Sequence, residues 1–307
     1  MDMNIWTAET VVTAVTQGNP NLEVVVSNYF KAFIERLAYF QINLQSVSTA
    51  EELNQKVLEG IAQLEAQRKE VLSVIEMFAL SNHPCLETCL PAFFRNLITF
   101  YEEYGINLYS GTSADVLRND HYRFFNQYLF ISVASVLLEN QCFEALRLIV
   151  QDKYKVFNQS YGLARDMNFI RFRAYNYTLN QFMNTGSPQR ISVTADYIAS
   201  FSGPVTFEKL IRADILLYYL SLWNHTNNVL DAYWLPELSV YNRSKDILPY
   251  MVSKTYFEKA KVLFGVDTVE QYRQLLASTP DTLERNGLYR VPMLPVGLMN
   301  DTVGSEA

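Results

Sequence analysis

One stretch of the chain, from Asp115 to Asn140, is apolar on almost every side when it is drawn as a helix. A helix without a polar face has no side that suits water, so such helices lie in the centre of a bundle. Its densest part, residues 124–138, contains two amides and two serines and is shorter than the roughly 18 apolar residues of a membrane span. We therefore predict a central buried helix around which the rest of the chain packs.

The segments on either side of this stretch repeat apolar residues at helical intervals, and we find no convincing β-type alternation. Thr49 followed by Glu52 is a capping box that starts a long helix ending near Leu80. The pattern predicts an all-α fold, either a multi-helix bundle or an irregular helical array. The remaining predicted helices cover residues 20–44, 91–104, 143–150, 191–201, 207–223, 253–264 and 268–277, with one or two more helices and loops in 153–190.

A turn-rich break at residues 105–113 suggests how the chain is organised. We place an acidic N-terminal helical region before it and an aromatic-rich helical region after it, although the two regions can also form one continuous domain. Gly and Pro in the last part predict an extended or disordered tail. The predicted regions are 1–108, 109–284 and 285–307.

Composition places the chain among globular proteins of a reducing compartment. Hydrophobic residues make up 49% of it, and 20 Tyr and 19 Phe supply ample area for a core. Three cysteines do not form a disulfide framework, and the first ten residues lack the charged-then-apolar order of a signal peptide. We expect a cytoplasmic protein that does not enter the membrane.

Motifs for catalysis and for nucleotide binding do not occur in the sequence. It contains no Walker-type loop, G-x-G-x-x-G, G-x-S-x-G or H-E-x-x-H. Cys85 and Cys89 stand one helical turn apart and suit zinc only if Cys142 or Glu87 completes the ligand set; buried free cysteines are the commoner outcome. We expect no catalytic residues, no metal site and no cofactor, which favours a role other than that of an enzyme.

One basic and aromatic segment stands out against a formal net charge of −7. Residues 153–190 contain six bases and a single acid, interleaved with Tyr and Phe. Its aromatics fit a core with solvated bases around it, a protein interface, or a surface for single-stranded nucleic acid. The candidate partner-binding residues are Lys153, Lys155, Arg165, Arg171, Arg173 and Tyr175.

Two charges interrupt the otherwise apolar helix predicted over residues 207–223. Arg212 and Asp214 are two residues apart, so they point to different sides of the helix and do not pair with each other. A buried charge must find a partner elsewhere or become neutral. We predict a buried polar clamp of Arg212, Asp214 and Arg243, in which Asp214 meets Arg243 or one of the arginines at 171 and 173.

Five packing motifs resemble those of uncharacterised bacterial helical proteins and occur in the same order along the chain. Related regions occur alone or behind Toll/interleukin-receptor-type effector domains in proposed anti-phage systems. The resemblance spans residues 25–276 and names no catalytic residue to carry over. Its motifs are Phe124–Phe130, Cys142–Leu146, Ala213–Tyr218, Trp234–Tyr241 and Tyr256–Lys259.

Together these features predict a non-catalytic binding, sensing or scaffolding protein. It would act through a protein partner or as a homo-oligomer, and the resemblance implies a place in bacterial anti-phage defence. The alternative is an enzyme or binder that acts on nucleic acid or a nucleotide through residues 153–190. A structural component of a homo-oligomer is the third interpretation.

Overall fold

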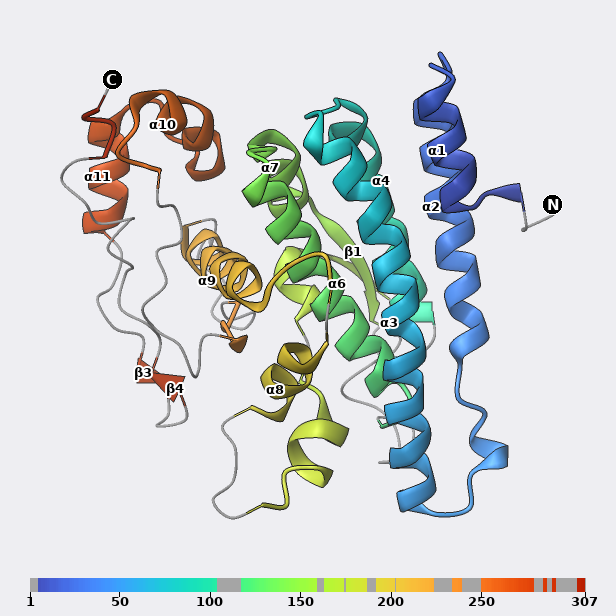
Figure 1. Cartoon of the computed structure of the whole chain (residues 1–307). Helices are drawn as coiled ribbons and strands as arrows, with labels where there is room; N and C mark the ends of the chain where they lie inside the picture. Colours follow the sequence, from blue (N-terminus) through green and yellow to red (C-terminus); the bar gives the residue numbers. More distant parts are fainter. Residues whose placement is uncertain are drawn as a thin grey trace.

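The computed structural model is an array of helices, and it confirms the all-α fold (Figure 1). Among the residues it describes, strands occur only as two short hairpins. The described residues are 5–103, 117–158, 163–173, 175–186, 192–201, 203–223, 234–238, 250–278, 284–285, 289–290 and 303–306.

Most α-helices follow the predicted positions closely. The long helix after Thr49 ends at Leu80, as its pattern predicts. Three helices differ from the prediction: α1 was not predicted, α2 ends at Leu37 and not near residue 44, and α4 begins at Cys85, before Pro91. Their bounds are α1 Ala8–Thr16, α2 Leu22–Leu37, α3 Ala50–Leu80, α4 Cys85–Glu103, α6 Asp120–Glu139, α7 Phe143–Gln151, α8 Val193–Ser200, α9 Phe207–Trp223, α10 Lys254–Ala260 and α11 Val269–Ala277. Short 3-10 helices are η2 Ala38–Phe40, η3 Leu44–Ser46, η4 Phe169–Phe172 and η7 Lys261–Phe264, and η5 Thr178–Phe182 is a π-helix.

The central helix is α6, and every residue from Asp120 to Leu138 is buried. It packs against α3 and α7, and against α9 from the C-terminal half of the chain. Figure 1 shows α6 between α9 on one side and α3 and α4 on the other. The prediction of a central buried helix is confirmed, because a helix that is apolar all round leaves no face for solvent.

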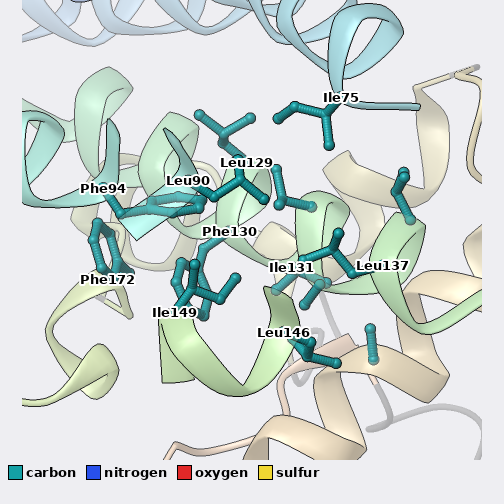
Figure 2. Packing of buried hydrophobic residues seen from close by; sticks show 14 of the residues in the cluster. Ile75, Leu90, Phe94, Leu129, Phe130, Ile131, Leu137, Leu146, Ile149 and Phe172 are labelled. Carbon is teal, nitrogen blue, oxygen red and sulfur yellow. The ribbon is translucent and has the colours of Figure 1, made fainter. Parts of the chain in front are cut away.

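Aromatic rings fill the space between α6 and its neighbours. Phe130 of α6 stacks on Phe172 with ring centroids 4.7 Å apart, and Phe94 of α4 meets it edge-on at 5.0 Å. Figure 2 shows these rings with Leu90 of α4 and Ile149 of α7 in one packed layer. Offset and edge-to-face pairs of this kind add to the energy of burial, so the many Phe and Tyr residues stabilise a single continuous core.

A side-chain cap determines where α3 begins. Thr49 Oγ1 accepts a hydrogen bond from the amide of Glu52 at 3.1 Å, as the capping box predicts. The carboxylate of Glu52 accepts from the amide of Ser48 at 2.8 Å instead of from that of Thr49. The cap satisfies amides that the first turn of a helix leaves without partners, and α3 then continues for 31 residues.

Where α3 crosses α6, glycine lets the two backbones approach. A Cβ atom at Gly60 would lie 3.0 Å from Cγ and Cδ2 of the His121 ring. His121 is fully buried, and its Nε2–H donates to the carbonyl oxygen of Phe40 at 2.9 Å. Burial lowers the pKa of His121 to about 4, so the ring is neutral at pH 7. Ring and glycine together set the distance between the two helices.

Residues 153–190 differ from their prediction, which had helices and loops there. Strand β1 (Tyr154–Asn158) pairs antiparallel with β2 (Leu163–Met167), and Lys155 lies opposite Asp166. Polar and apolar residues alternate from Lys153 to Val156, and Phe157 then interrupts the pattern. Four residues are the lower limit of a strand pattern, so the signal was too weak to predict the hairpin.

The C-terminal part of the chain is tied back to α10. At the start of the predicted tail, β3 (Glu284–Arg285) pairs with β4 (Tyr289–Arg290). Residues 303–306 dock beside α10, where the amide of Lys254 donates to the carbonyl oxygen of Glu306 at 2.7 Å. Val303 is buried at this contact. The predicted boundary at residue 108 lies outside the described residues, and α3 packs against α6 across it.

The contact of Gly60 with His121 predicts an unusual response to alanine. Glycine to alanine inside a helix normally stabilises a protein by up to about 1 kcal/mol, but a crowded methyl costs about 1–3 kcal/mol. We therefore expect Gly60→Ala to lower the free energy of unfolding, measured by urea titration. Ala62→Gly, at an exposed position of α3, calibrates the intrinsic propensity. A more stable Gly60→Ala variant would refute the close contact.

Candidate functional site

The basic end of the candidate partner-binding segment lies on the surface of the β1–β2 hairpin. Lys153 and Lys155 are exposed, and Tyr154 between them is buried. The Tyr154 ring meets Phe172 edge-on with centroids 4.9 Å apart, and its hydroxyl donates to the carbonyl oxygen of Ile149. Burial raises the pKa of Tyr154 well above its usual range. The tyrosine therefore fixes the hairpin to the core, and the two lysines point outward.

The other candidates of this segment divide between core and surface. Arg171 and Arg173 are half-buried, and Arg173 Nε donates to the carbonyl oxygen of Leu235 at 3.1 Å. Tyr175 is exposed to 38% and meets Tyr177 edge-on at 4.9 Å. The side chain of Arg165 lies outside the described part of the structure. Of the six predicted residues, Lys153, Lys155 and Tyr175 are thus shown to be exposed.

Sequence analysis missed two exposed apolar side chains that follow Tyr175. Phe182 at the end of η5 is exposed to 42%, and Met183 after it to 44%. A surface cavity of about 420 Å³ lies between η5 and α8. The sequence carries no signal of their exposure, because apolar residues without helical spacing do not show which side faces solvent. We call Tyr175, Phe182 and Met183, together with the residues that line the cavity, the η5 surface; the lining residues are Met183, Asn184, Gly186, Val193, Asp196, Tyr197 and Ser200.

A buried ion pair on the first turn of α6 holds η5 in place. Asp120 accepts hydrogen bonds from Arg123 Nη1 at 2.7 Å and from the amide of Thr178 at 2.6 Å. The side chains of Asp120 and Arg123 are both completely buried. Asn176 Nδ2 donates to the carbonyl oxygen of Asp120 at 2.9 Å. Burial raises the pKa of Asp120, while Arg123 and the Thr178 amide oppose that shift.

Asp214 is buried, as predicted, and among the described residues its hydrogen-bond donors are neutral groups, although the charge of Arg173 also acts on it. Its carboxylate accepts from Trp234 Nε1 at 2.7 Å and from the amide of Leu238 at 2.8 Å. Trp234 is itself fully buried, with ring centroids 5.8 Å from both Phe130 and Phe169. Both donors are neutral: one is the indole of Trp234 and the other is the backbone amide of Leu238. We call this contact, with residues 234–238, the Trp234 anchor.

A second buried carboxylate fastens the same segment to α6 and to the start of α8. Glu237 accepts from Gln127 Nε2 at 3.2 Å and from Ser192 Oγ at 2.6 Å. Ser192 is also the N-cap of α8, where its hydroxyl accepts from the amide of Ala195. One short segment therefore connects three helices, because each of its polar groups meets a partner on a different element.

The Trp234 anchor holds an acid whose charge is unfavourable. Complete burial raises the pKa of Asp214 to about 7. Hydrogen bonds from Trp234 and the Leu238 amide lower the pKa, the charge of Glu237 raises it further, and Arg173 lowers it. The carboxyl group therefore exchanges its proton near neutral pH while it remains hydrogen-bonded inside the fold.

Of the remaining members of the predicted clamp, the structure describes only Arg212, and Arg212 does not contact Asp214. Arg212 lies on another side of α9 and pairs with Glu139 of α6 at 3.0 Å, where Lys209 is also 3.3 Å from the same carboxylate. The prediction that Arg212 and Asp214 point to different sides of α9 is therefore confirmed. Arg243 lies outside the described residues.

Comparisons with protein-family models, with curated proteins and with solved structures return no match for this chain. Among the residues that the structure describes, no three His, Cys, Asp or Glu side chains gather where they could hold a metal ion. No helix in that part of the chain is both long enough and apolar enough to cross a membrane.

The raised pKa of Asp214 predicts how stability depends on pH. Its native pKa, about 7, lies above the ordinary 3.8, so between these values the native state binds more protons than the unfolded state. Stability therefore falls as pH rises from about 4 to 7 and changes little above that. Asn cannot ionise, so Asp214→Asn should remove a drop on the order of 1–3 kcal/mol between pH 5 and pH 7.5.

Urea unfolding followed by tryptophan fluorescence at the two pH values measures this difference. Asp267→Asn, which changes an exposed carboxyl group, serves as the matched control and should unfold like the wild type. An Asp214→Asn variant with the same change in stability between the two pH values as the wild type would contradict the assignment.

Proposed function

We propose that this protein is a non-catalytic binding or scaffolding protein that acts through contact with another protein. The resemblance described above implies a role in bacterial defence against phage, and the cysteine content favours the cytoplasm. The observation that supports the proposal best is the exposure of Tyr175, Phe182 and Met183 within nine residues of chain whose backbone is anchored to α6.

Exposed residues of these types suit a protein contact. Aromatic residues and Met are enriched at interfaces, where a few of them supply most of the binding energy. The cavity beside Met183 is lined by Val193 and Tyr197, so it offers apolar walls to a partner's side chain. Asp196 at the same cavity adds a carboxylate, which favours a partner with a basic residue at that point.

The anchor under the η5 surface strengthens this argument. Binding costs free energy when loops and side chains must be ordered. The amide of Thr178 is already bound to Asp120, and Leu179 donates its amide to the side chain of Asn176 at 2.9 Å. The backbone that carries Phe182 is therefore held before any partner arrives, which lowers the cost of binding.

Positive charge on the β1–β2 hairpin would contribute to binding separately from the η5 surface. Lys153 and Lys155 are exposed on a chain whose formal net charge is −7. Local positive charge of this kind speeds encounter with an acidic surface and weakens with salt. The same charge suits single-stranded nucleic acid, so the experiments must separate the two kinds of partner.

A charge placed on the η5 surface tests the protein contact. We expect the tagged full-length chain to co-purify a protein from its native host, and Phe182→Asp to reduce the recovery at least about tenfold, since burying a new carboxylate without a partner costs more than 1.4 kcal/mol. Tyr39→Asp, at a residue of η2 that is 72% exposed, is the matched control and should leave recovery unchanged. Equal recovery with Phe182→Asp would contradict the proposal.

Two further measurements separate the alternatives. If the partner is a second copy of the chain, light scattering after size exclusion will show a mass above 35.4 kDa that Phe182→Asp lowers to the monomer. If the partner is nucleic acid, a labelled single-stranded oligonucleotide will bind more weakly at higher salt, and Lys153→Glu with Lys155→Glu will abolish binding. Oligonucleotide binding of that kind, without recovery of a protein, would replace the protein contact by the alternative.

A further inference from the structure

Two thiols meet on the first turns of α4. Cys85 is the first residue of this helix and Cys89 lies one turn later, with their Sγ atoms 3.5 Å apart. The amide of Cys85 donates to Nδ1 of His83 at 3.1 Å. Cys142, the remaining cysteine of the chain, donates its thiol to the carbonyl oxygen of Ala79 at 3.4 Å. The chain thus holds one thiol pair and one thiol bound to the backbone.

The Cys89 thiol contacts two residues at exposed positions of α2. Ser27 Oγ lies 3.5 Å from Cys89 Sγ, and the carbonyl oxygen of Glu23 accepts from that thiol at 3.7 Å. Ser27 and Glu23 both belong to exposed positions of α2, although the thiols themselves are buried. A cavity of about 620 Å³ at the loop between α1 and α2 is bordered by Glu23 and His83. An exposed side chain, that of Ser27, therefore contacts the Cys89 sulfur directly, and exposed side chains change rotamer within nanoseconds.

The surroundings make the two thiols unequal. The hydrogen bond from Cys85, with a smaller contribution from Ser27, lowers the pKa of Cys89 to about 7, against an opposing effect of burial. The same hydrogen bond, together with burial, raises the pKa of Cys85 far above its usual range. Burial, together with the charge of Glu87, raises the pKa of Cys142 to about 11. Geometry supports the same order, because both Cys85 Sγ and Ser27 Oγ lie 3.5 Å from the Cys89 sulfur, whereas the Cys142 thiol donates to a backbone carbonyl. A thiolate is the reactive form of cysteine, so we take Cys89 as the nucleophile.

We propose that Cys85 and Cys89 form a reversible oxidation site for small hydroperoxides, with Cys89 as the attacking thiolate and Cys85 as the resolving thiol. Cys89 sulfur attacks one peroxide oxygen, so an S–O bond forms while the O–O bond breaks. The sulfur loses two electrons and becomes a sulfenic acid, and the other oxygen leaves as an alcohol or as water after taking a proton.

The second step joins the two sulfurs. Cys85 attacks the sulfur of the Cys89 sulfenic acid, an S–S bond forms, and hydroxide leaves and takes the proton of the Cys85 thiol as water. Two thiols and one hydroperoxide thus yield a disulfide, an alcohol and water. Two electrons from a thiol reductant return the pair to its starting state.

Closing this disulfide must change the start of α4. On a regular helix, residues i and i+4 have Cβ atoms roughly 5–6 Å apart, whereas a disulfide needs about 3.5–4.5 Å. Cys85 begins the helix, and its amide is bound to His83 instead of to a helical carbonyl, so the first turn can rearrange. Since α4 packs against α2, oxidation would alter the contact at Ser27 and Glu23. This site is independent of the η5 surface.

Treating the reduced full-length protein with hydrogen peroxide at pH 7.4 tests the proposal. Peptide mass spectrometry should find a Cys85–Cys89 disulfide that dithiothreitol reverses, and Cys89 should react at least about tenfold faster than Cys142 in the same molecule. In Cys85→Ser the sulfenic acid persists at Cys89 and is trapped by dimedone. Cys142→Ser is the matched control and should form the disulfide as the wild type does.

Two readouts do not depend on a cysteine variant that folds. The rate at Cys89 should rise with pH up to about 7 and then level off, whereas the rate at Cys142 should still be rising at pH 9. Ser27→Ala removes a hydrogen bond to the Cys89 sulfur and should slow the reaction severalfold at pH 6.5. If Cys89 reacts no faster than Cys142, or if no disulfide with Cys85 forms, the proposal is overturned.

Discussion

Burial of α6 on every side is the constraint on which the rest of the structure depends, because it removes the polar side chains of this helix from water. A buried polar group without a partner costs about 1–3 kcal/mol, so packing that brings a partner to such a group is favoured. Arg68 of α3 donates to Ser132 Oγ at 3.0 Å while it holds Glu65 with two hydrogen bonds and lies 3.8 Å from the centre of the Tyr128 ring. The polar positions of α6 thereby specify which segments lie where, in addition to what apolar contact provides.

The same requirement connects the core to the surface. Asp120 belongs to the central helix, yet its carboxylate binds the amide at the start of η5, a few residues before the exposed Phe182. In a similar way, Asp214 and Glu237 hold residues 234–238 between α9, α6 and the start of α8. A surface loop held by buried hydrogen bonds keeps its shape, and this is the property that a binding surface needs in order to recognise a partner without a large entropic cost.

The two proposals use different parts of this framework. The η5 surface depends on hydrogen bonds from α6, whereas the thiol pair depends on the packing of α4 against α2, where Phe30 and Phe93 lie with ring centroids 4.5 Å apart. Rings of this size hold the middle of both helices in register while the first turn of α4 carries the two thiols. A chemical change at the thiols would therefore be confined to one end of α4, because close-packed aromatic layers resist displacement.

The sequence by itself determined the helical class, the central position of α6 and the start of α3, since these follow from apolar spacing and from local capping. It also determined that Asp214 is buried and that Arg212 faces another side of α9. Only the tertiary structure decided which groups meet Asp214, because Trp234 and Leu238 approach it from a segment twenty residues away. It likewise decided which aromatics face solvent, and it revealed the short β1–β2 hairpin. Local patterns report periodicity over one or two turns, whereas partners and exposure depend on how distant segments pack.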